Sequence, residues 1–304
     1  MWRVYAALIV ASLLWRSLYT AAKPAVEATG PMQVTLCRVT LAFLCLAPIA
    51  FARGGANAML TPLKSHWRAI LLLGVLNFAG SQILALNALV FLPASVNSVL
   101  NNTHPLWVAI GTTLLYSARR PALLLGGSLV ALAGVFVIFA PDLLRSTSAE
   151  PISPVGVALS LAGSGVIAIG TVLGRRIMPG NDPMAVTALG SGAAVLPVLA
   201  LTLASGGVQP IVEADGQIKA LLVYVGVGCT AINYALWYYG LKHMPAAGAS
   251  AFQYLIPPIG VFLAAIFLGE PITVSLLLGT VCILVGLFAT QAAMYSVRTK
   301  RSFD

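Results

Sequence analysis

Residues 93–107, PASVNSVLNNTHPLW, place strongly polar side chains inside a run that is otherwise apolar. The polar residues are Asn97, Asn101, Asn102 and His104, and Pro105 follows them directly. If this run is one helix, Asn97, Asn101 and His104 fall at i, i+4 and i+7 and share one face. Amide and imidazole groups are costly in a bilayer unless they line a cavity or bond to other helices. We expect this face to form a cavity wall, with helix–helix bonding as the alternative.

The same stretch recurs later in the chain at an offset of 152 residues, and no gap is needed between residues 74 and 136. The offset maps Pro93 onto Pro245, Pro105 onto Pro257, Gly74 onto Gly226, Gly127 onto Gly279, Gly134 onto Gly286, and Asn101 onto Gln253. Any one of these matches could arise by chance. Together they indicate an internal duplication.

Composition places the chain in a membrane. Its 304 residues are 59% apolar and only 8% charged, whereas a soluble domain carries about 25% charged residues. The net charge of +9 therefore indicates membrane topology and not a nucleic-acid surface. The cysteines lie in apolar segments at unrelated spacings, so we expect neither disulfides nor a metal site, and no cofactor.

Ten apolar segments have about the length of a membrane-spanning helix. They cover residues 4–22, 32–52, 68–90, 93–116, 121–140, 153–175, 183–204, 217–240, 246–268 and 272–295. We therefore expect an all-α integral membrane protein with a single transmembrane domain over residues 1–304. Within it, residues 4–140 and 153–295 would form two five-helix repeats.

Loop charges set the expected orientation. Twelve of the 17 basic residues fall on one side of the ten spans and three on the other. Basic loops favour the cytoplasm, so both termini are expected there. Because each repeat has an odd number of spans, the second copy enters from the opposite face. Such inverted repeats are typical of secondary transporters, whose substrate site lies near the bilayer midplane where the halves meet.

Several motifs resemble the EamA type of the drug/metabolite transporter superfamily. They are LLW at 13–15, the basic residue within LCRVTLAFL at 36–44, PPIGVFLAAIFLGEPIT at 257–273, and the glycines of the last span, Gly279 and Gly286. The first half departs from the pattern, with YSARRPA at 116–122 in place of LGEP. The first span departs too, because Arg16 stands directly after Trp15 where the family usually has a small residue.

Among subfamilies the chain is most similar to the YddG-like aromatic amino-acid exporters. The resemblance implies export of amino acids, aromatic and other neutral ones, and related metabolites. Export would cross the inner membrane of a bacterial cell by alternating access. It also implies a central cavity formed by spans 1–4 and 6–9, with spans 5 and 10 at the periphery.

Amides and hydroxyls suit the charged ends of a zwitterion, and rings suit its side chain. The side chains expected around the cavity are Trp15, Ser17 and Tyr19 in span 1, Asn77, Ser81 and Gln82 in span 3, Asn97, Asn101, His104 and Trp107 in span 4, Ser164 and Thr171 in span 6, Asn233, Tyr234, Trp237 and Tyr238 in span 8, and Gln253 and Tyr254 in span 9. Trp107 is equally well explained as a packing residue. For Tyr238 and Tyr239 we favour an interfacial aromatic belt.

Ionisable residues and helix-breaking residues within the spans suggest the mechanism of transport. No Asp or Glu lies in the middle of a span, so we expect facilitated or exchange transport, with a neutral His104 bonded to Asn101. Proton coupling through His104 is the alternative. For Arg38 we favour a pair with Glu27 or with backbone carbonyls. Pro105, Pro257 and Gly163 are the expected gating positions, because proline bends helices and glycine permits close packing.

Other functions fit the residues less well. A carrier of cationic drugs would want acidic residues in the cavity, and a nucleotide-sugar carrier would want a basic cluster; these are the alternatives within the same superfamily. A membrane enzyme is not expected, because the three histidines are scattered. A channel lacks a repeated charged ring or filter motif. The expected partners are the substrate and the lipid bilayer, with a monomer favoured over a weak dimer.

Overall fold

The computed structural model describes residues 2–116, 120–149, 153–255 and 274–295, and each element within these ranges is helical. The first half contains α1 (Trp2–Thr29), α2 (Pro31–Leu73), η1 (Gly74–Gly80), α3 (Ser81–Phe91), α4 (Ala94–Asn101), α5 (His104–Tyr116) and α6 (Pro121–Ala149). The second contains α7 (Pro154–Ile177), α8 (Pro183–Ala204), α9 (Gln209–Glu213), α10 (Gly216–Val223), η2 (Tyr224–Ile232), α11 (Asn233–His243), α12 (Ala246–Ala251), η3 (Phe252–Leu255) and α14 (Val274–Tyr295).

Six of the described helices are long and apolar enough to cross a membrane. One of them, Pro31–Phe91, holds two of the ten expected spans, because α2 is interrupted by non-helical backbone at Gly55 and His66. Gly55 has a φ of 60°, a left-handed conformation that favours glycine. The stretch between these two spans is therefore largely helical, where the sequence led us to expect a loop. The expected span at 246–268 runs into residues outside the described part of the chain.

The expected span at 93–116 is broken, so the prediction of one continuous helix was wrong. The chain turns at Asn102 and Thr103, between α4 and α5. Pro105 is the second residue of α5. Proline is tolerated in the first turn of a helix but not in its interior, because its ring clashes with the preceding turn. Helix α4 consequently ends at Asn101, and α5 begins at His104, which places Pro105 in the first turn of α5.

Two spans contain a π-helical segment at corresponding places. These are η1, which leads into α3, and η2, which leads into α11. In a π-helix the backbone bonds skip one residue further than in an α-helix, and such segments frequently occur at functional sites. Gly74 and Gly226 lie in these two segments at the sequence offset noted above.

The part of α2 before Gly55 packs antiparallel against α8. The Thr202 hydroxyl donates to the Met32 carbonyl at 3.3 Å near one end of the pair. Arg53 reaches the Met184 sulfur at 3.5 Å near the other end. The two helices therefore cross the bundle in opposite directions.

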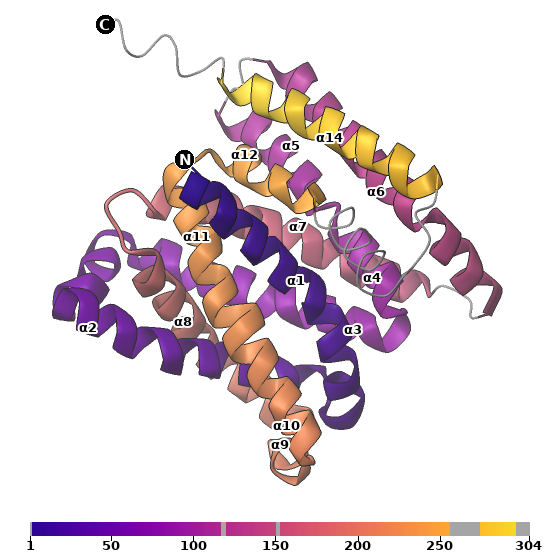
Figure 1. Cartoon of the computed structure of the whole chain (residues 1–304). Helices are drawn as coiled ribbons and strands as arrows, with labels where there is room; N and C mark the ends of the chain where they lie inside the picture. The colour runs from indigo at the N-terminus through magenta and orange to yellow at the C-terminus, as the bar shows by residue number, and fades with distance from the viewer. Residues whose placement is uncertain (1, 117–119, 150–152, 256–273, 296–304) are drawn as a thin grey trace, which may run out of the picture.

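Helices α6 and α14 form a second antiparallel pair along one flank of the bundle (Figure 1). A Cβ atom on Gly127 would lie 2.8 Å from the Gly286 carbonyl oxygen, and one on Gly134 would lie 2.5 Å from that of Gly279. Because only glycine leaves room for this approach, the two backbones touch. The offset of 152 residues maps Gly127 onto Gly279 and Gly134 onto Gly286. The two contacts are therefore equivalent under the internal duplication.

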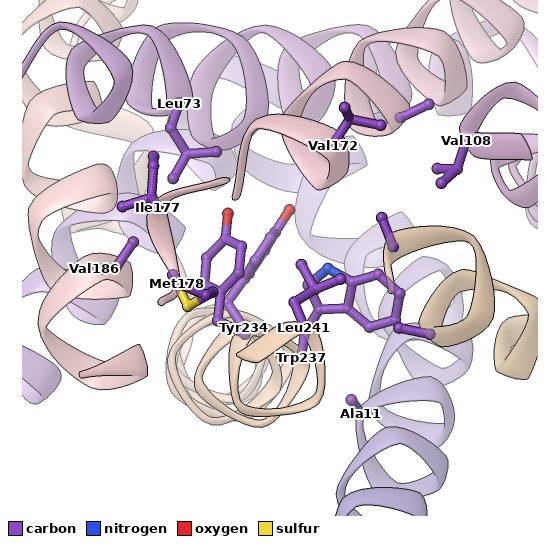
Figure 2. Close-up of a cluster of buried hydrophobic side chains, with 14 of the residues drawn as sticks. Ala11, Leu73, Val108, Val172, Ile177, Met178, Val186, Tyr234, Trp237 and Leu241 are labelled. Carbon is purple, nitrogen blue, oxygen red and sulfur yellow. The ribbon is translucent and has the colours of Figure 1, made fainter. Parts of the chain in front are cut away.

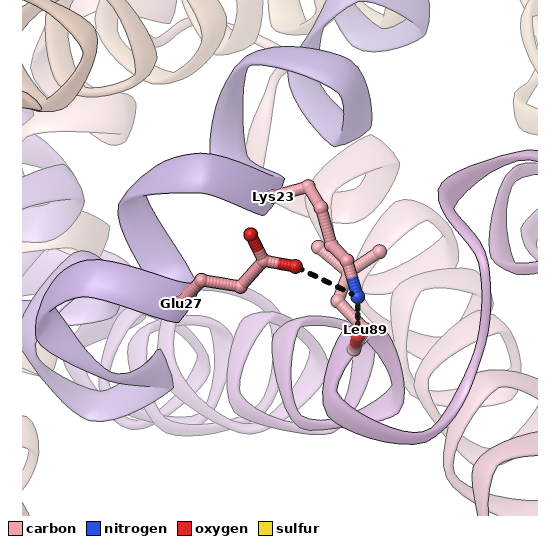
Figure 3. Close-up of polar contacts among 3 residues, drawn as sticks. All are labelled: Lys23, Glu27 and Leu89. Atoms are coloured by element: carbon pink, nitrogen blue, oxygen red, sulfur yellow. Dashed lines mark hydrogen bonds and ion pairs between the residues drawn. The ribbon is translucent and has the colours of Figure 1, made fainter.

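Lys23 forms an ion pair within α1 and a hydrogen bond that joins α1 to α3 (Figure 3). The Lys23 ammonium lies 3.3 Å from the Glu27 carboxylate and donates to the Leu89 carbonyl at 2.7 Å. Leu89 is in the last turn of α3, where carbonyls lack helical partners and a cation is favourable. Glu27 thus pairs with Lys23, and the expected pair between Glu27 and Arg38 is not formed.

Candidate functional site

A buried guanidinium lies where three helical elements meet. Arg38 of α2 has no exposed surface. Its Nε donates to the Thr230 hydroxyl of η2 at 3.0 Å, and its Nη1 donates to the Gln82 amide oxygen of α3 at 2.5 Å. The expected partners, Glu27 and backbone carbonyls, are therefore replaced by two neutral side chains. The Nη2 atom is buried without a hydrogen-bond partner.

Gln82 extends this cluster toward the eighth span. Its Nε2 donates to the Tyr234 hydroxyl at 2.8 Å and to the Ser81 hydroxyl at 3.3 Å. Gln82 and Tyr234 are 152 residues apart, which is the offset of the internal duplication. Equivalent positions of the two halves therefore touch.

Aromatic rings form one wall beside the polar groups. Trp15 meets the ring of Tyr234 at a centroid distance of 5.6 Å and that of Trp237 at 5.0 Å, both edge to face. Phe78 lies 4.6 Å from Tyr234. Figure 2 shows Tyr234 and Trp237 projecting from α11 into the buried apolar cluster near Met178 and Leu241. Such rings offer apolar area with a polar edge.

His104 bridges this wall and the sixth span. Its Nδ1 lies 2.9 Å from the Gln253 amide oxygen, and its Nε2 lies 3.2 Å from the Thr171 hydroxyl. The predicted bond to Asn101 was wrong, because the break between α4 and α5 separates the two residues. An amide oxygen accepts only, so Nδ1 carries a proton, whereas the Thr171 hydroxyl can either donate to Nε2 or accept from it. The Trp237 ring lies 6.1 Å from the imidazole.

Asn97 and Asn101 form a separate network against α7. The Asn97 amide nitrogen donates to the Ala85 carbonyl at 2.9 Å, and its oxygen accepts from Ser160 at 2.7 Å. Asn101 donates to the Ser160 hydroxyl at 2.9 Å and to the Asn97 oxygen at 3.1 Å. These bonds fit the structural alternative for the two asparagines, although the Asn101 amide oxygen remains unpartnered.

Two further predicted residues are buried on the eighth span. Tyr238 accepts a hydrogen bond from the Asn77 amide at 3.0 Å and has no exposed surface, so the aromatic-belt prediction was wrong for it. Asn233 is also fully buried, and both its amide atoms lack a partner. A buried amide without hydrogen bonds is costly, so Asn233 has a donor and an acceptor that its described neighbours leave unused.

Ser17, Ser164 and Trp107 bond to other side chains. The Ser17 hydroxyl is 2.6 Å from that of Tyr224, and Ser164 lies 2.8 Å from Thr103. Trp107 is 42% exposed and lines an apolar groove, with its indole nitrogen donating to Thr103 at 3.2 Å.

Tyr19, Tyr254 and Gly163 are also packed inside the bundle. Tyr19 packs in a cluster with Leu18, Ala22 and neighbouring residues. The buried Tyr254 packs beside α6 and α14, with Val99 and Ile283 among its neighbours. Gly163 packs against α3, where its Cβ would lie 3.3 Å from the Ser81 carbonyl oxygen. Pro257 lies outside the described residues.

Some members of the site escaped the sequence reasoning. Thr230, Phe78 and Ser160 were not singled out, and Arg38 was assigned a structural role. A signal did exist for Thr230, because a hydroxyl beside the two glycines of η2 interrupts an apolar segment. Pairing over 192 residues, as between Arg38 and Thr230, cannot be read from spacing along one chain.

The sequence profile of the EamA-like transporter family matches this chain twice, over residues 2–140 and 154–291. The chain belongs to the EamA-like transporter family. It is accordingly a multi-pass membrane protein of a transporter family, and the resemblance found in its motifs is confirmed.

Several relatives of this EamA-like chain are named as transporters, exporters or efflux pumps. It is 25% identical to an uncharacterized transporter of Archaeoglobus fulgidus, covering 95% of this chain and 97% of that one. It is 26% identical to a probable amino-acid metabolite efflux pump of Salmonella typhimurium, covering 69% and 71%. It is also 26% identical to a probable terminal-alkyne amino-acid exporter of Streptantibioticus cattleyicolor, covering 87% and 85%. One crystal structure shares the fold, with a TM-score of 0.74 and 19% identity over 97% of this chain and 99% of that chain.

Proposed function

We propose that this protein exports amino acids, aromatic and other neutral ones, and related metabolites across the bacterial inner membrane. The observation that carries this proposal is the buried cluster in which Arg38, with one unpartnered nitrogen, bonds to Gln82, which bonds to Tyr234, whose ring meets that of Trp15. Asn233 directly precedes Tyr234 on α11 and is buried with both amide atoms unpartnered. A zwitterion with an apolar side chain needs that combination of donors, acceptors and apolar surface. The relatives named as amino-acid exporters support it.

An inverted pair of five-helix repeats would provide alternating access. The two family matches, one to each half, support the duplication. The antiparallel pairing of α2 with α8 and of α6 with α14 supports the inversion, because these helices correspond at the sequence offset. The contact between Gln82 and Tyr234 supports a pseudo-two-fold axis through the site. Two halves of one design can exchange conformations, which exposes a central site to each side in turn.

The expected orientation has both termini in the cytoplasm. Basic residues assigned to that side meet at one end of the bundle: Arg175 donates to the Lys242 carbonyl at 3.2 Å, and the Lys242 ammonium donates to the Asn181 carbonyl at 2.9 Å. Gln33, near the start of α2, donates to carbonyls of the Ser205–Gly207 turn. This end of α2 is the one assigned to the exterior. These contacts support the ten-span topology drawn from the sequence.

Transport would be facilitated or by exchange. The polar side chains of the cluster that the structure describes include no Asp or Glu, and both contacts of His104 are to uncharged groups, Gln253 and Thr171. Movement would occur at the break before Pro105, along the close contact between Gly163 and α3, and at Pro257. Opening there would hydrate the buried cluster from one side at a time.

Flux in proteoliposomes tests this function. Vesicles containing the purified protein are loaded with labelled phenylalanine, threonine or methionine, with and without a pH gradient. Saturable flux that other amino acids compete and that the pH gradient leaves unchanged is the expected result. Asn233→Ala should lower the flux, whereas Asn87→Ala should not, because the Asn87 amide donates to the Ile83 carbonyl in its own helix. Absence of amino-acid flux in the unmodified protein would refute the proposal.

The alternative cargoes are cationic drugs and nucleotide sugars. A buried guanidinium disfavours a cationic cargo, because the two charges would repel at short range. The same vesicles loaded with a labelled organic cation or a nucleotide sugar separate these cases. Flux of either one without flux of amino acids would replace the amino-acid assignment.

A further inference from the structure

We propose that Arg38 binds the carboxylate of the transported substrate, an inference that rests on the proposed function. The site would then be selective for molecules with a free carboxylate. Amides and esters of the same molecules would be poor substrates.

The Arg38 guanidinium has hydrogen-bonding capacity that its partners leave unused. Arginine carries five N–H groups in a planar fork. Nε uses one on Thr230, and Nη1 uses one on Gln82. Nη2 is buried and uses neither of its own. The unused donors can hold a carboxylate through two parallel hydrogen bonds, the geometry in which arginine binds such groups most strongly.

The positive charge of Arg38 is buried without a described counter-ion. Arg38 has no exposed surface, and none of the Asp and Glu side chains that the structure describes forms an ion pair with it. Both of its hydrogen-bond acceptors are neutral. A buried cation without a counter-ion is strongly unfavourable, and an anion that arrives with hydrogen bonds to it relieves that cost. The substrate carboxylate supplies both the negative charge and the missing acceptors.

Thr230 and Gln82 hold the Arg38 guanidinium in a fixed orientation. The Thr230 hydroxyl donates to the Val225 carbonyl at 2.7 Å, so its oxygen lone pairs remain available to Arg38. The Gln82 amide nitrogen donates to Tyr234 and Ser81, which turns the amide oxygen toward Arg38. A binding group whose orientation is set in advance loses less entropy when its ligand arrives.

The position of the cluster also fits an amino acid. Gln82 connects Arg38 to the Tyr234 hydroxyl, and the Tyr234 ring contacts Trp15 and Phe78. A carboxylate on Arg38 would therefore leave the rest of the substrate near aromatic surface. Asn233, whose amide is unpartnered and which precedes Tyr234 on α11, is available to the ammonium group through its oxygen.

The test compares a carboxylate with its uncharged counterpart. Flux of labelled phenylalanine into proteoliposomes is competed with unlabelled phenylalanine, with N-acetylphenylalanine, which keeps the carboxylate, and with phenylalaninamide, which lacks it. Hydrogen bonds to charged groups contribute enough to predict about tenfold or more weaker competition by the amide. In Arg38→Gln this ratio should fall to about one. Lys23→Gln, which removes a basic residue that lies outside the cluster, should leave it unchanged.

Each outcome is decisive. No phenylalanine flux in the unmodified protein overturns the proposed function, and this inference with it. Flux that phenylalanine and its amide compete equally overturns the inference alone. Discrimination that persists in Arg38→Gln also overturns it, because another group would then read the carboxylate. If Arg38→Gln carries no flux, its thermal stabilisation by phenylalanine and by the amide is compared in detergent, and stabilisation that still favours phenylalanine overturns the inference.

Discussion

Adding one methyl group to Gly134 tests the antiparallel packing on which the inverted repeat depends. In Gly134→Ala the new Cβ would lie 2.5 Å from the Gly279 carbonyl oxygen and 2.9 Å from Cys282 Cβ and Ile283 Cγ1. Carbon atoms of this kind are normally 3.5–4.0 Å apart. The α6 and α14 backbones must therefore separate, and overpacking of this kind costs about 1–3 kcal/mol.

A control on the same helix isolates that cost. Gly126 has no atom within 4 Å of the position where a Cβ would lie. Alanine is favoured over glycine in a helix by about 1 kcal/mol, and this gain is common to Gly126→Ala and Gly134→Ala. The difference between the two variants is therefore the packing cost alone. On the scale of soluble domains, about 2–4 °C per kcal/mol, Gly134→Ala should melt about 2–12 °C below Gly126→Ala.

The measurement is thermal unfolding of both purified variants in one detergent, repeated in lipid bicelles. Gly127→Ala should behave like Gly134→Ala, because its Cβ would lie 2.8 Å from the Gly286 carbonyl oxygen. Equal melting temperatures for Gly126→Ala and Gly134→Ala would refute the close approach of α6 and α14. They would also remove this support for the inverted repeat.

Three other predictions follow from the same contacts. Replacing His104 with glutamine should lower flux but leave its pH dependence unchanged between about pH 6 and 8, the range in which an unperturbed histidine titrates; a flattened profile would assign it a coupled proton. Cysteines at Met32 and Thr202 should cross-link readily across α2 and α8. Cysteines at Met32 and Met184 should not, because Met184 lies roughly 27 Å from Thr202 along α8. Asn97→Ala should destabilise the protein by about 1–3 kcal/mol in thermal unfolding, because the Ser160 hydroxyl loses its acceptor, and no loss would contradict that role.

The helices and the membrane setting followed from hydropathy, because a bilayer admits few backbone forms other than helices. The places where helices break were harder to predict. Asn102 and Thr103 end α4, although the pattern of amides suggested a continuous face. Proline marks where a helix cannot continue, but the residue at which it stops depends on which neighbours satisfy the freed backbone groups.

The polar residues of the site could be selected from sequence, but their partners could not. His104, Gln82 and Asn233 stood out as polar groups in apolar spans, and all three are buried in the bundle. His104 nevertheless bonds to Gln253 and Thr171. Tyr238, near the end of its span, is buried against Asn77. Which groups meet depends on the rotation of each helix about its axis, and packing sets that rotation.

Composition and hydropathy thus established an all-helical membrane protein, and the motifs carried the resemblance to its family. The matches at a fixed offset predicted a duplicated chain, and the loop charges predicted both termini in the cytoplasm. These properties depend on local chemistry and on the solvent around each segment, which are present in the sequence. Only the tertiary structure could bring Arg38 to Thr230 and Gln82 and leave Nη2 unpartnered. The physical reason is that a guanidinium is satisfied or left unsatisfied by the atoms that surround it in space. Those atoms come from helices whose mutual positions are set by packing over the whole bundle.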